Sequence, residues 1–271
     1  MSDRRAARDA ARRSRARRDR TVATVSTVVV LGLLVGAIVT SKGWPDVKET
    51  FFNWDVFKDA FPDVLKGFWL DIKMFVAVEI VVLIFGLLVA LARISTLPAI
   101  APLRLLGAVY VDLFRGVPVI LVVYLIGFGV PALQLSGVPD DPVLLGCFAL
   151  VLCYGAYNAE VYRAGIRTVH PTQRAAALAV GLTERQTLRH VVLPQAVRRV
   201  SAPLLNDFIS LQKDVALISV LGPLEAYRVA QVYASSNFNY TPLIAAAVLY
   251  LFVTVPLAQI VERMQRRRGE V

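Results

Sequence analysis

The stretch RAAALAVGLTERQTLRHVVLPQAVRR runs from Arg174 to Arg199 and combines small residues and arginines with two turn signals. It stands out because 56% of the 271 residues in the chain are hydrophobic, only 18% are charged, and the mean hydropathy is +0.59. Such a composition is too apolar for one water-soluble domain of this size. We therefore expect a membrane protein in which this stretch lies between two spans.

Six segments fit the template of about 20 mainly apolar residues that a membrane-spanning helix needs. They lie near 21–40, 68–92, 106–130, 142–162, 203–222 and 242–261. The third contains the motif FRGVP at 114–118, which places an arginine, a glycine and a proline inside it, so this span can begin as an interfacial helix. The predicted fold is all-α and polytopic, with about six transmembrane helices.

Positive charge gathers at three places beside these spans. Residues 1–20 carry nine arginines against three aspartates, 163–199 carries seven against Glu184 alone, and 263–268 carries four. Because lysine and arginine mark the cytoplasmic side, we expect a basic cytoplasmic tail at 1–20, a transmembrane domain at 21–262 and a basic cytoplasmic tail at 263–271. The arginines are expected to attract anionic membrane lipid rather than nucleic acid. The first span is expected to stay uncleaved, since it is long enough to cross and no A-x-A site follows.

Motifs for catalysis and metal binding are missing from the sequence. It contains no G-x-x-x-x-G-K-[ST], G-x-S-x-G or H-E-x-x-H pattern, and its two histidines, His170 and His190, lack metal-ligand spacing. We therefore expect no catalytic residue, no metal ligand and no bound cofactor in this chain. Any ATP chemistry is expected in a separate protein.

The segment around the quoted stretch divides into two short helices, within a cytoplasmic loop at about 167–195. Pro171 suits a first helical turn, and Gly181 suits the left-handed position that ends a helix. Thr183 to Gln186 fits a capping box for the second helix, which Pro194 is predicted to close.

The first of these helices has only about nine residues, which is too short to be stable alone. Ala175, Ala176 and Ala179 lie along one side of it, where small side chains let another surface approach the backbone. Two interpretations remain open: a docking helix, and an ordinary interfacial helix whose alanines favour helicity.

Several motifs together resemble those of one family. The order A-A-x-A-x-G is followed after about a dozen residues by LPQA, and FRGVP at 114–118, YNAEVYRAGI at 157–166 and LQKDVALISVLG at 211–222 accompany them. This combination is similar to permease subunits of bacterial ABC importers for polar amino acids, over about residues 64–263. The resemblance implies the importer permease fold in a bacterial cytoplasmic membrane. Both termini are expected in the cytoplasm from the distribution of arginine.

The resemblance also implies that the loop carries a coupling helix, which sits in a groove of a cytoplasmic ATPase. The residues implied in this ATPase coupling are Arg174, Ala175, Ala176, Ala177, Ala179, Gly181 and Leu182. The implied partners are a dimer of ABC ATPases that binds ATP and Mg, an extracytoplasmic amino-acid-binding protein, and a second permease subunit, identical or related. One departure concerns Ala175, because the family usually has Glu there; Arg174 and Glu184 are candidates to replace its polar contact.

A polar arc runs along the predicted fifth span. Asn206, Asp207, Ser210, Lys213 and Asp214 occupy about 120° of the helix circumference. Ionisable groups at this depth cost about 3 kcal/mol or more each unless they are paired or face water. The predicted substrate pathway consists of Glu79, Asn158, Glu160, Asn206, Asp207, Ser210, Lys213 and Asp214.

Other interpretations of the arc remain open. Lys213 can instead pair with Asp214, Asp207 or Glu160 simply to hold helices together. An alternative function is a secondary transporter or channel that uses the intramembrane acids, although the capped double-helix loop then has no explanation. An intramembrane enzyme would need a nucleophile and a base close together, and the sequence shows neither.

Overall fold

The computed structural model describes residues 2–267, and every regular element in that range is helical. The chain divides into two units, Met1–Asn53 and Trp54–Val271. In the first unit, α1 (Ser2–Val39) is followed by the short helix α2 (Trp44–Phe51). The predicted first span is part of α1: its stretch Asp19–Val39 has a mean hydropathy of 2.5 and no buried residue. Most of the basic segment predicted at 1–20 belongs to the same helix, while Met1 lies outside the described residues.

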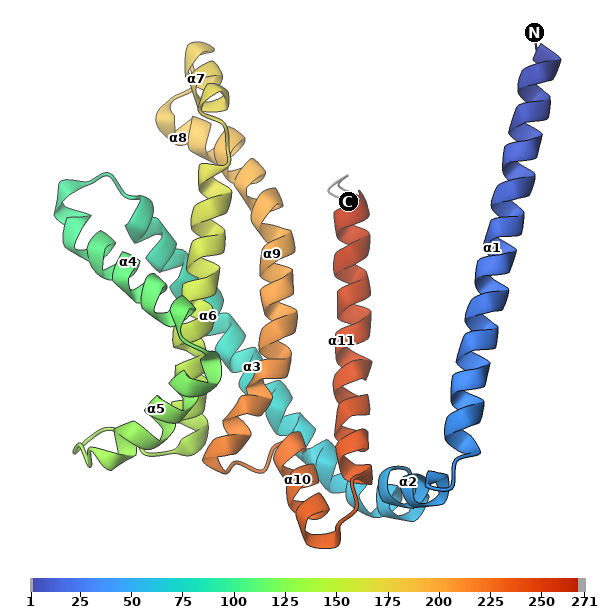
Figure 1. The fold of residues 1–271 in the computed structure, drawn as a ribbon. Coiled ribbons are helices and arrows are strands. Elements are labelled where there is room, and N and C mark those ends of the chain that lie inside the picture. The colour runs from blue at the N-terminus through green and yellow to red at the C-terminus, as the bar shows by residue number, and fades with distance from the viewer. Residues whose placement is uncertain (1, 268–271) are drawn as a thin grey trace. The chain divides into compact units, whose positions relative to one another are not determined.

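Four long helices dominate the second unit (Figure 1): α3 (Trp54–Ile94), α6 (Pro142–Arg167), α9 (Leu193–Asp214) and α11 (Thr241–Arg267). The main core lies between α3, α6 and α9, where Val82, Leu150 and Leu211 are fully buried. Helices α3 and α6 approach each other so closely at Gly86 that a Cβ on this residue would lie 2.9 Å from the Cβ of Asn158. A larger residue at Gly86 would therefore push the two helices apart.

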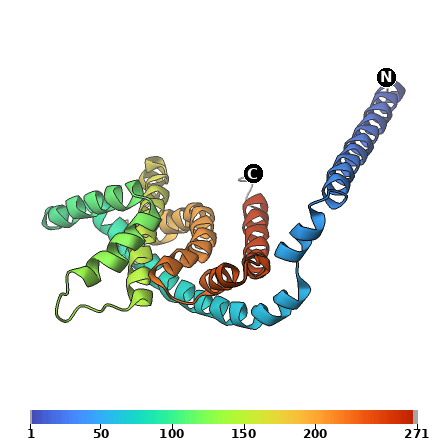
Figure 2. The same ribbon diagram turned by 60° about the horizontal axis from the view of Figure 1, so that its bottom comes forward.

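The predicted third span is broken rather than straight. After the short turn η1 (Pro98–Ile100), α4 (Ala101–Gly116) and α5 (Val119–Ala132) meet at 105° (Figure 2). Val117 has φ −105° and ψ 135°. Such extended backbone is what the proline that follows, Pro118, favours in the residue before it. The break thus falls inside the FRGVP motif.

The helix before the fifth span continues where the sequence predicted an end. Helix α8 (Glu184–Thr187) passes through the π turn η2 (Leu188–Val192) into α9, so the prediction that Pro194 closes it is wrong. In the π turn the N–H of Leu193 bonds to the carbonyl of Leu188. Pro194 then occupies the first turn of α9, where a missing N–H is tolerated.

The fifth span itself forms from α9 and the 3-10 segment η3 (Val215–Leu221). Gly222, with φ +108°, and then Pro223 end it, and α10 (Ala226–Asn237) continues at an angle of 50°. Over the described residues four helices are long and apolar enough to cross a membrane, and the number rises to six when each bent pair counts as one span. The predicted tail at 263–271 starts inside α11, and its residues 268–271 lie outside the described part.

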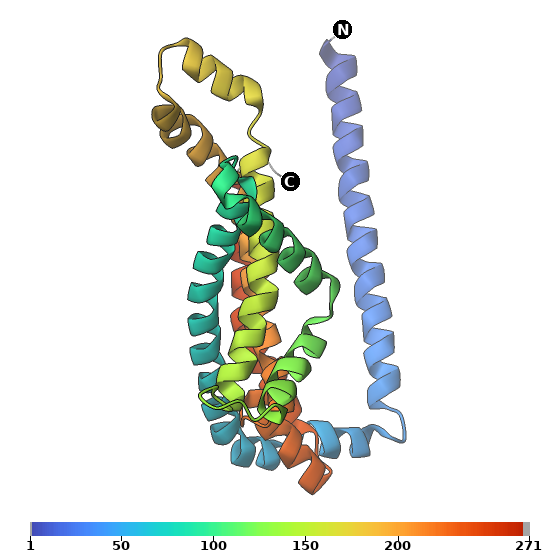
Figure 3. The same ribbon diagram turned by 90° about the vertical axis from the view of Figure 1, so that its left-hand side faces the viewer.

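The two ends of the second unit differ in construction. The loop that follows α6 carries α7 (Pro171–Ala179) and α8, and it projects beyond the long helices at one end (Figure 3). Helix α10 and the start of α11 lie at the opposite end (Figure 1). The two candidate functional regions are the loop and the polar arc of α9. They adjoin each other along the chain, because α9 follows α8 and η2 directly.

Candidate functional site

The loop helix α7 has a defined beginning and end. The ring Nδ1 of His170 accepts a hydrogen bond from the N–H of Thr172 at 3.3 Å, which caps the helix in front of Pro171. At the other end Gly181 has φ +88°, its N–H bonds to the carbonyl of Leu178 at 3.0 Å, and the N–H of Leu182 bonds to that of Ala177 at 3.2 Å. This pair of bonds is a Schellman motif, so the predicted left-handed helix end at Gly181 is confirmed.

Helix α8 starts with the predicted capping box. The N–H of Thr183 donates to Gln186 Oε1 at 2.8 Å, and the N–H of Gln186 donates to Thr183 Oγ1 at 3.3 Å. Two otherwise unpaired donors are satisfied reciprocally. The turn between α7 and α8 is therefore fixed on both sides by local hydrogen bonds.

An ion pair joins the two loop helices. Arg174 on α7 donates from Nη2 to Glu184 Oε2 at 2.7 Å and from Nε to the same oxygen at 3.1 Å. Both side chains are about 60% exposed. The two residues considered as replacements for the family's usual Glu thus bind each other across the turn.

The small residues of α7 lie mostly on the outside of the loop. Ala175, Ala176 and Ala179 are exposed, and a Cβ on Gly181 would have no atom within 4 Å. Leu182 is half-buried, and Ala177 is turned inward with 6% exposure. The exposed small-residue face is therefore open to close approach by another surface, and Ala177 is the member of the predicted set that packs within the chain.

The polar arc of α9 points partly out of the chain. Asn206 and Lys213, seven residues apart and so on the same side of the helix, are exposed, whereas Leu211 on another side is buried. Asp207, Ser210 and Asp214 are half-buried between the two sides.

The partners of the arc differ from those considered from the sequence. Asp214 Oδ2 accepts a hydrogen bond from the hydroxyl of Tyr154 at 2.8 Å. Between residues 19 and 265, where side chains are described, Lys213 forms no ion pair or hydrogen bond. The suggested pairing of Lys213 with Asp214, Asp207 or Glu160 is therefore not formed.

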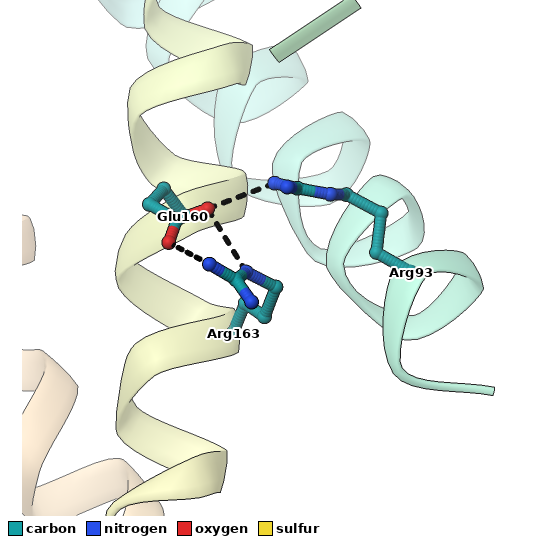
Figure 4. Close-up of polar contacts among 3 residues, drawn as sticks. All are labelled: Arg93, Glu160 and Arg163. Carbon is teal, nitrogen blue, oxygen red and sulfur yellow. Dashed lines mark hydrogen bonds and ion pairs between the residues drawn. The ribbon is translucent and has the colours of Figure 1, made fainter. Parts of the chain in front are cut away.

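Glu160 binds two arginines instead (Figure 4). Its Oε2 accepts from Arg93 Nη1 at 2.8 Å and from Arg163 Nε at 2.9 Å, and its Oε1 accepts from Arg163 Nη2. The side chains are 21%, 10% and 23% exposed for Glu160, Arg93 and Arg163. This triad ties the end of α3 to α6. The spacing of Glu160 and Arg163 is readable in the sequence, but Arg93 is 67 positions away from Glu160 and carries no such signal.

A cleft of about 470 Å³ brings together two of the predicted pathway residues, Glu160 and Asp207. Sequence reasoning missed four further polar residues in its lining, Arg115 on α4, Tyr157 on α6, Thr168 at the end of α6 and Arg199 on α9. The cleft thus offers carboxylates and guanidinium groups together, which suits a ligand that carries both signs of charge. The predicted residues that do not line it are Glu79, Asn158, Asn206, Ser210, Lys213 and Asp214; of these, Glu79 and Asn158 are buried, with 8% and 1% exposure.

Comparison with known proteins identifies the family. Residues 83–270 match the model for the binding-protein-dependent transport system inner membrane component. The arginine transport system permease protein ArtQ of Bacillus subtilis (strain 168) is 32% identical over 207 residues, which are 76% of this chain and 92% of ArtQ. The glutamine transport system permease protein GlnP of Escherichia coli (strain K12) is 32% identical over 222 residues, 80% of this chain and 97% of GlnP.

Solved structures give the same result. A crystal structure of an amino acid ABC transporter with histidines matches with a TM-score of 0.68 and 29% identity, over 76% of this chain and 94% of the matched chain. The predicted all-α permease fold is confirmed, and the alternatives of a secondary transporter, channel or intramembrane enzyme are set aside. The chain belongs to the inner membrane components of binding-protein-dependent transport systems, the permease subunits of ABC importers.

Proposed function

We propose that this permease subunit imports polar amino acids delivered by an extracytoplasmic binding protein, as one half of a permease dimer driven by two cytoplasmic ATPase subunits. ATP and Mg bind to the ATPase subunits in this proposal, and this chain supplies the pathway and the coupling surface. The cargo class is supported by similarity to permeases named for arginine and glutamine transport. It is also supported by the mixed charges of the cleft around Glu160 and Asp207.

The main support for a pathway between two permease subunits is the outward-facing polar side of α9. Asn206 and Lys213 are exposed in the single chain, within a predicted span. A charged side chain directed at lipid costs about 3 kcal/mol or more on insertion scales, so this side of the helix needs water or protein next to it. A second permease subunit, identical or related, supplies that neighbour and encloses a polar pathway between the two.

The coupling surface is the exposed small-residue face of α7. A helix of nine residues is held in place by its caps and by the Arg174–Glu184 ion pair, while Ala175, Ala176 and Ala179 stay uncovered. This arrangement favours the docking interpretation, in which an ATPase groove covers these residues. The positive-inside rule supports the further proposal that the loop and both termini lie in the cytoplasm of a bacterial cell.

Reconstitution tests the proposal directly. The chain is incorporated into proteoliposomes with its ATPase and binding protein, and ATP hydrolysis and uptake are measured with a panel of amino acids. We expect polar amino acids to stimulate both activities and apolar ones to leave them at the basal rate. Uptake that proceeds without ATP, or stimulation by no amino acid, contradicts the proposal.

A further inference from the structure

Two buried carboxylic acids meet where α10 begins, away from the coupling loop and the polar arc. Asp71 on α3 is 1% exposed, and Glu225, the residue that caps α10, is 0% exposed. Their carboxyl groups lie close together, since the N–H of Ala226, the residue after Glu225, reaches an oxygen of Asp71. The backbone is equally tight, because a Cβ on Gly67 would lie 2.6 Å from the carbonyl carbon of Glu225. The pair is therefore shielded from water.

Most oxygen atoms of the pair already have donors. The hydroxyl of Tyr250 on α11 donates to Asp71 Oδ2 at 2.8 Å, and the N–H of Ala226 reaches the same oxygen at 3.4 Å. The N–H groups of Tyr227 and Arg228 donate to the two carboxylate oxygens of Glu225 at 2.7 and 2.6 Å. Asp71 Oδ1 is left without a donor among the described residues.

No cation balances the two acids within the part of the chain whose side chains are described. On α10, the guanidinium of Arg228 is directed to Gln231 Oε1 at 2.9 Å. On α3, Lys66 bonds Asp63 at 2.7 Å, and Lys73 is exposed two residues from Asp71, on the opposite side of the helix. The titratable group that α11 contributes is the neutral hydroxyl of Tyr250. Two carboxylates in contact at a dry site repel strongly, so one of them keeps a proton.

We propose that Asp71 and Glu225 bind one proton between them, carried on Asp71 Oδ1, and that this proton fastens α10 to α3 and α11. Glu225 is the better anion, because both of its oxygens accept N–H groups in the first turn of α10, where the helix dipole favours negative charge. A proton on Asp71 Oδ1 gives this oxygen a hydrogen to donate to Glu225. The one orphaned oxygen of the pair is then satisfied.

The site has a consequence for transport, because α10 follows η3 and the polar side of α9 directly along the chain. While the proton is bound, the beginning of α10 is held by α3 and α11. When alkaline pH removes the proton, the two carboxylates repel each other and the contact of α10 with α3 and α11 weakens. Uptake by the assembled importer is therefore expected to fall at alkaline pH.

Infrared spectroscopy of the full chain in lipid nanodiscs tests the proton itself. At neutral pH the difference spectrum between the wild type and Asp71→Asn is expected to contain the carbonyl band of a protonated carboxyl group. The amide that this substitution introduces still offers a donor toward Glu225, so the variant is expected to fold. The matched control is Asp63→Asn on the same helix, which removes an exposed carboxylate and is expected to leave the band in place.

Two milder measurements separate the proposal from a simple folding defect. Tyr250→Phe removes the donor to Asp71 Oδ2 and is expected to shift the band, because that oxygen is then the carbonyl of the protonated acid. The melting temperature of the wild type is expected to fall as pH rises, since the folded chain holds a proton that the unfolded chain releases. Glu225→Gln is expected to lose that slope. A spectrum that neither Asp71→Asn nor Tyr250→Phe changes, or equal pH slopes for the wild type and Glu225→Gln, overturns the proposal.

Discussion

Arg174 of α7 and Glu184 of α8 form an ion pair across the turn between the two loop helices, with 2.7 Å between Nη2 and Oε2. The resemblance of the sequence to importer permeases predicts Glu at the position of Ala175, immediately after Arg174 in this chain. In this chain the negative charge next to Arg174 is that of Glu184, ten residues further along, and the contact stays within the loop. The pair and the Schellman turn at Gly181 together set the angle at which α7 is presented.

Charge reversal tests the ion pair. Arg174→Glu and Glu184→Arg each place like charges together, so we expect each to lower the ATP hydrolysis that cargo-loaded binding protein stimulates in proteoliposomes. The double variant restores opposite charges and is expected to recover most of that activity. Because both side chains are about 60% exposed, thermal stability should change by less than about 1 kcal/mol in every variant.

The control for this series is Arg189→Glu. Arg189 is an exposed arginine of η2, and it forms no ion pair among the described residues of the loop. The variant is expected to behave like the wild type. A double variant that is as inactive as the single ones would show that the individual charges, rather than their pairing, matter for coupling.

Two substitutions at Gly181 distinguish the effect of backbone strain from the effect of contact with the ATPase. A Cβ at this residue meets no atom of the chain within 4 Å, so Ala and Leu are expected to destabilise the isolated protein equally, by about 1–2 kcal/mol for the left-handed backbone. Only Leu obstructs the close approach of a partner. We expect Gly181→Leu to insert normally but to uncouple ATP hydrolysis from uptake, with Gly181→Ala much less affected.

The chain contains a matched control for this experiment. Gly137 has φ +82° and equally open surroundings, but it lies in the loop after α5, at the other end of α6. Gly137→Leu is expected to show the same loss of melting temperature and normal coupling. Normal coupling in Gly181→Leu as well would mean that no partner surface approaches this glycine.

Local signals allowed the loop to be predicted from the sequence. Pro171, Gly181 and the Thr183–Gln186 box act within a few residues, and the structure places a helix start, a helix end and a cap there. The π turn at 188–192 was missed, because bonds to the fifth residue leave no periodic signal in so short a segment. The predicted end at Pro194 failed for this reason.

The polar contacts were predicted less completely, and sequence separation explains the difference. The arc on α9 follows from helical periodicity, and its outward side is present in the structure. The partner of Glu160 on α3 and the contact of Asp71 with Tyr250 join residues 67 and 179 positions apart. Such pairings depend on how helices pack, which a single sequence does not encode as a local pattern.

Membrane topology can be checked by labelling single cysteines with an impermeant thiol reagent in intact cells. The distribution of arginine predicts protection at Arg5, Glu184 and Arg267 and labelling at Asp55 and Asp140. The experiment is done in a background that lacks Cys147 and Cys153, which are both free thiols. Labelling of the Glu184 position from outside would remove both the orientation and the proposed coupling surface.

Glu160 and Lys213 were both predicted as pathway residues, but their neutralisation is expected to affect the stability of the protein differently. Glu160→Gln leaves Arg93 and Arg163 without their shared counter-ion, and removal of one partner of a largely buried pair costs up to about 3 kcal/mol. We therefore expect less folded protein. Lys213→Gln breaks no contact within the described chain and is expected to keep the melting temperature.

If Lys213 lines the pathway, its neutralisation lowers amino-acid uptake by about tenfold, which corresponds to a loss of roughly 1.4 kcal/mol. Uptake per folded transporter and melting temperature are the two quantities to compare. The exchange Lys213→Asp with Asp214→Lys is expected to lower both, because it removes the hydrogen bond between Tyr154 and Asp214. Recovery of both folding and uptake in the exchanged variant would instead show that the two residues act as each other's counter-ions, and the pathway would have to lie on another side of α9.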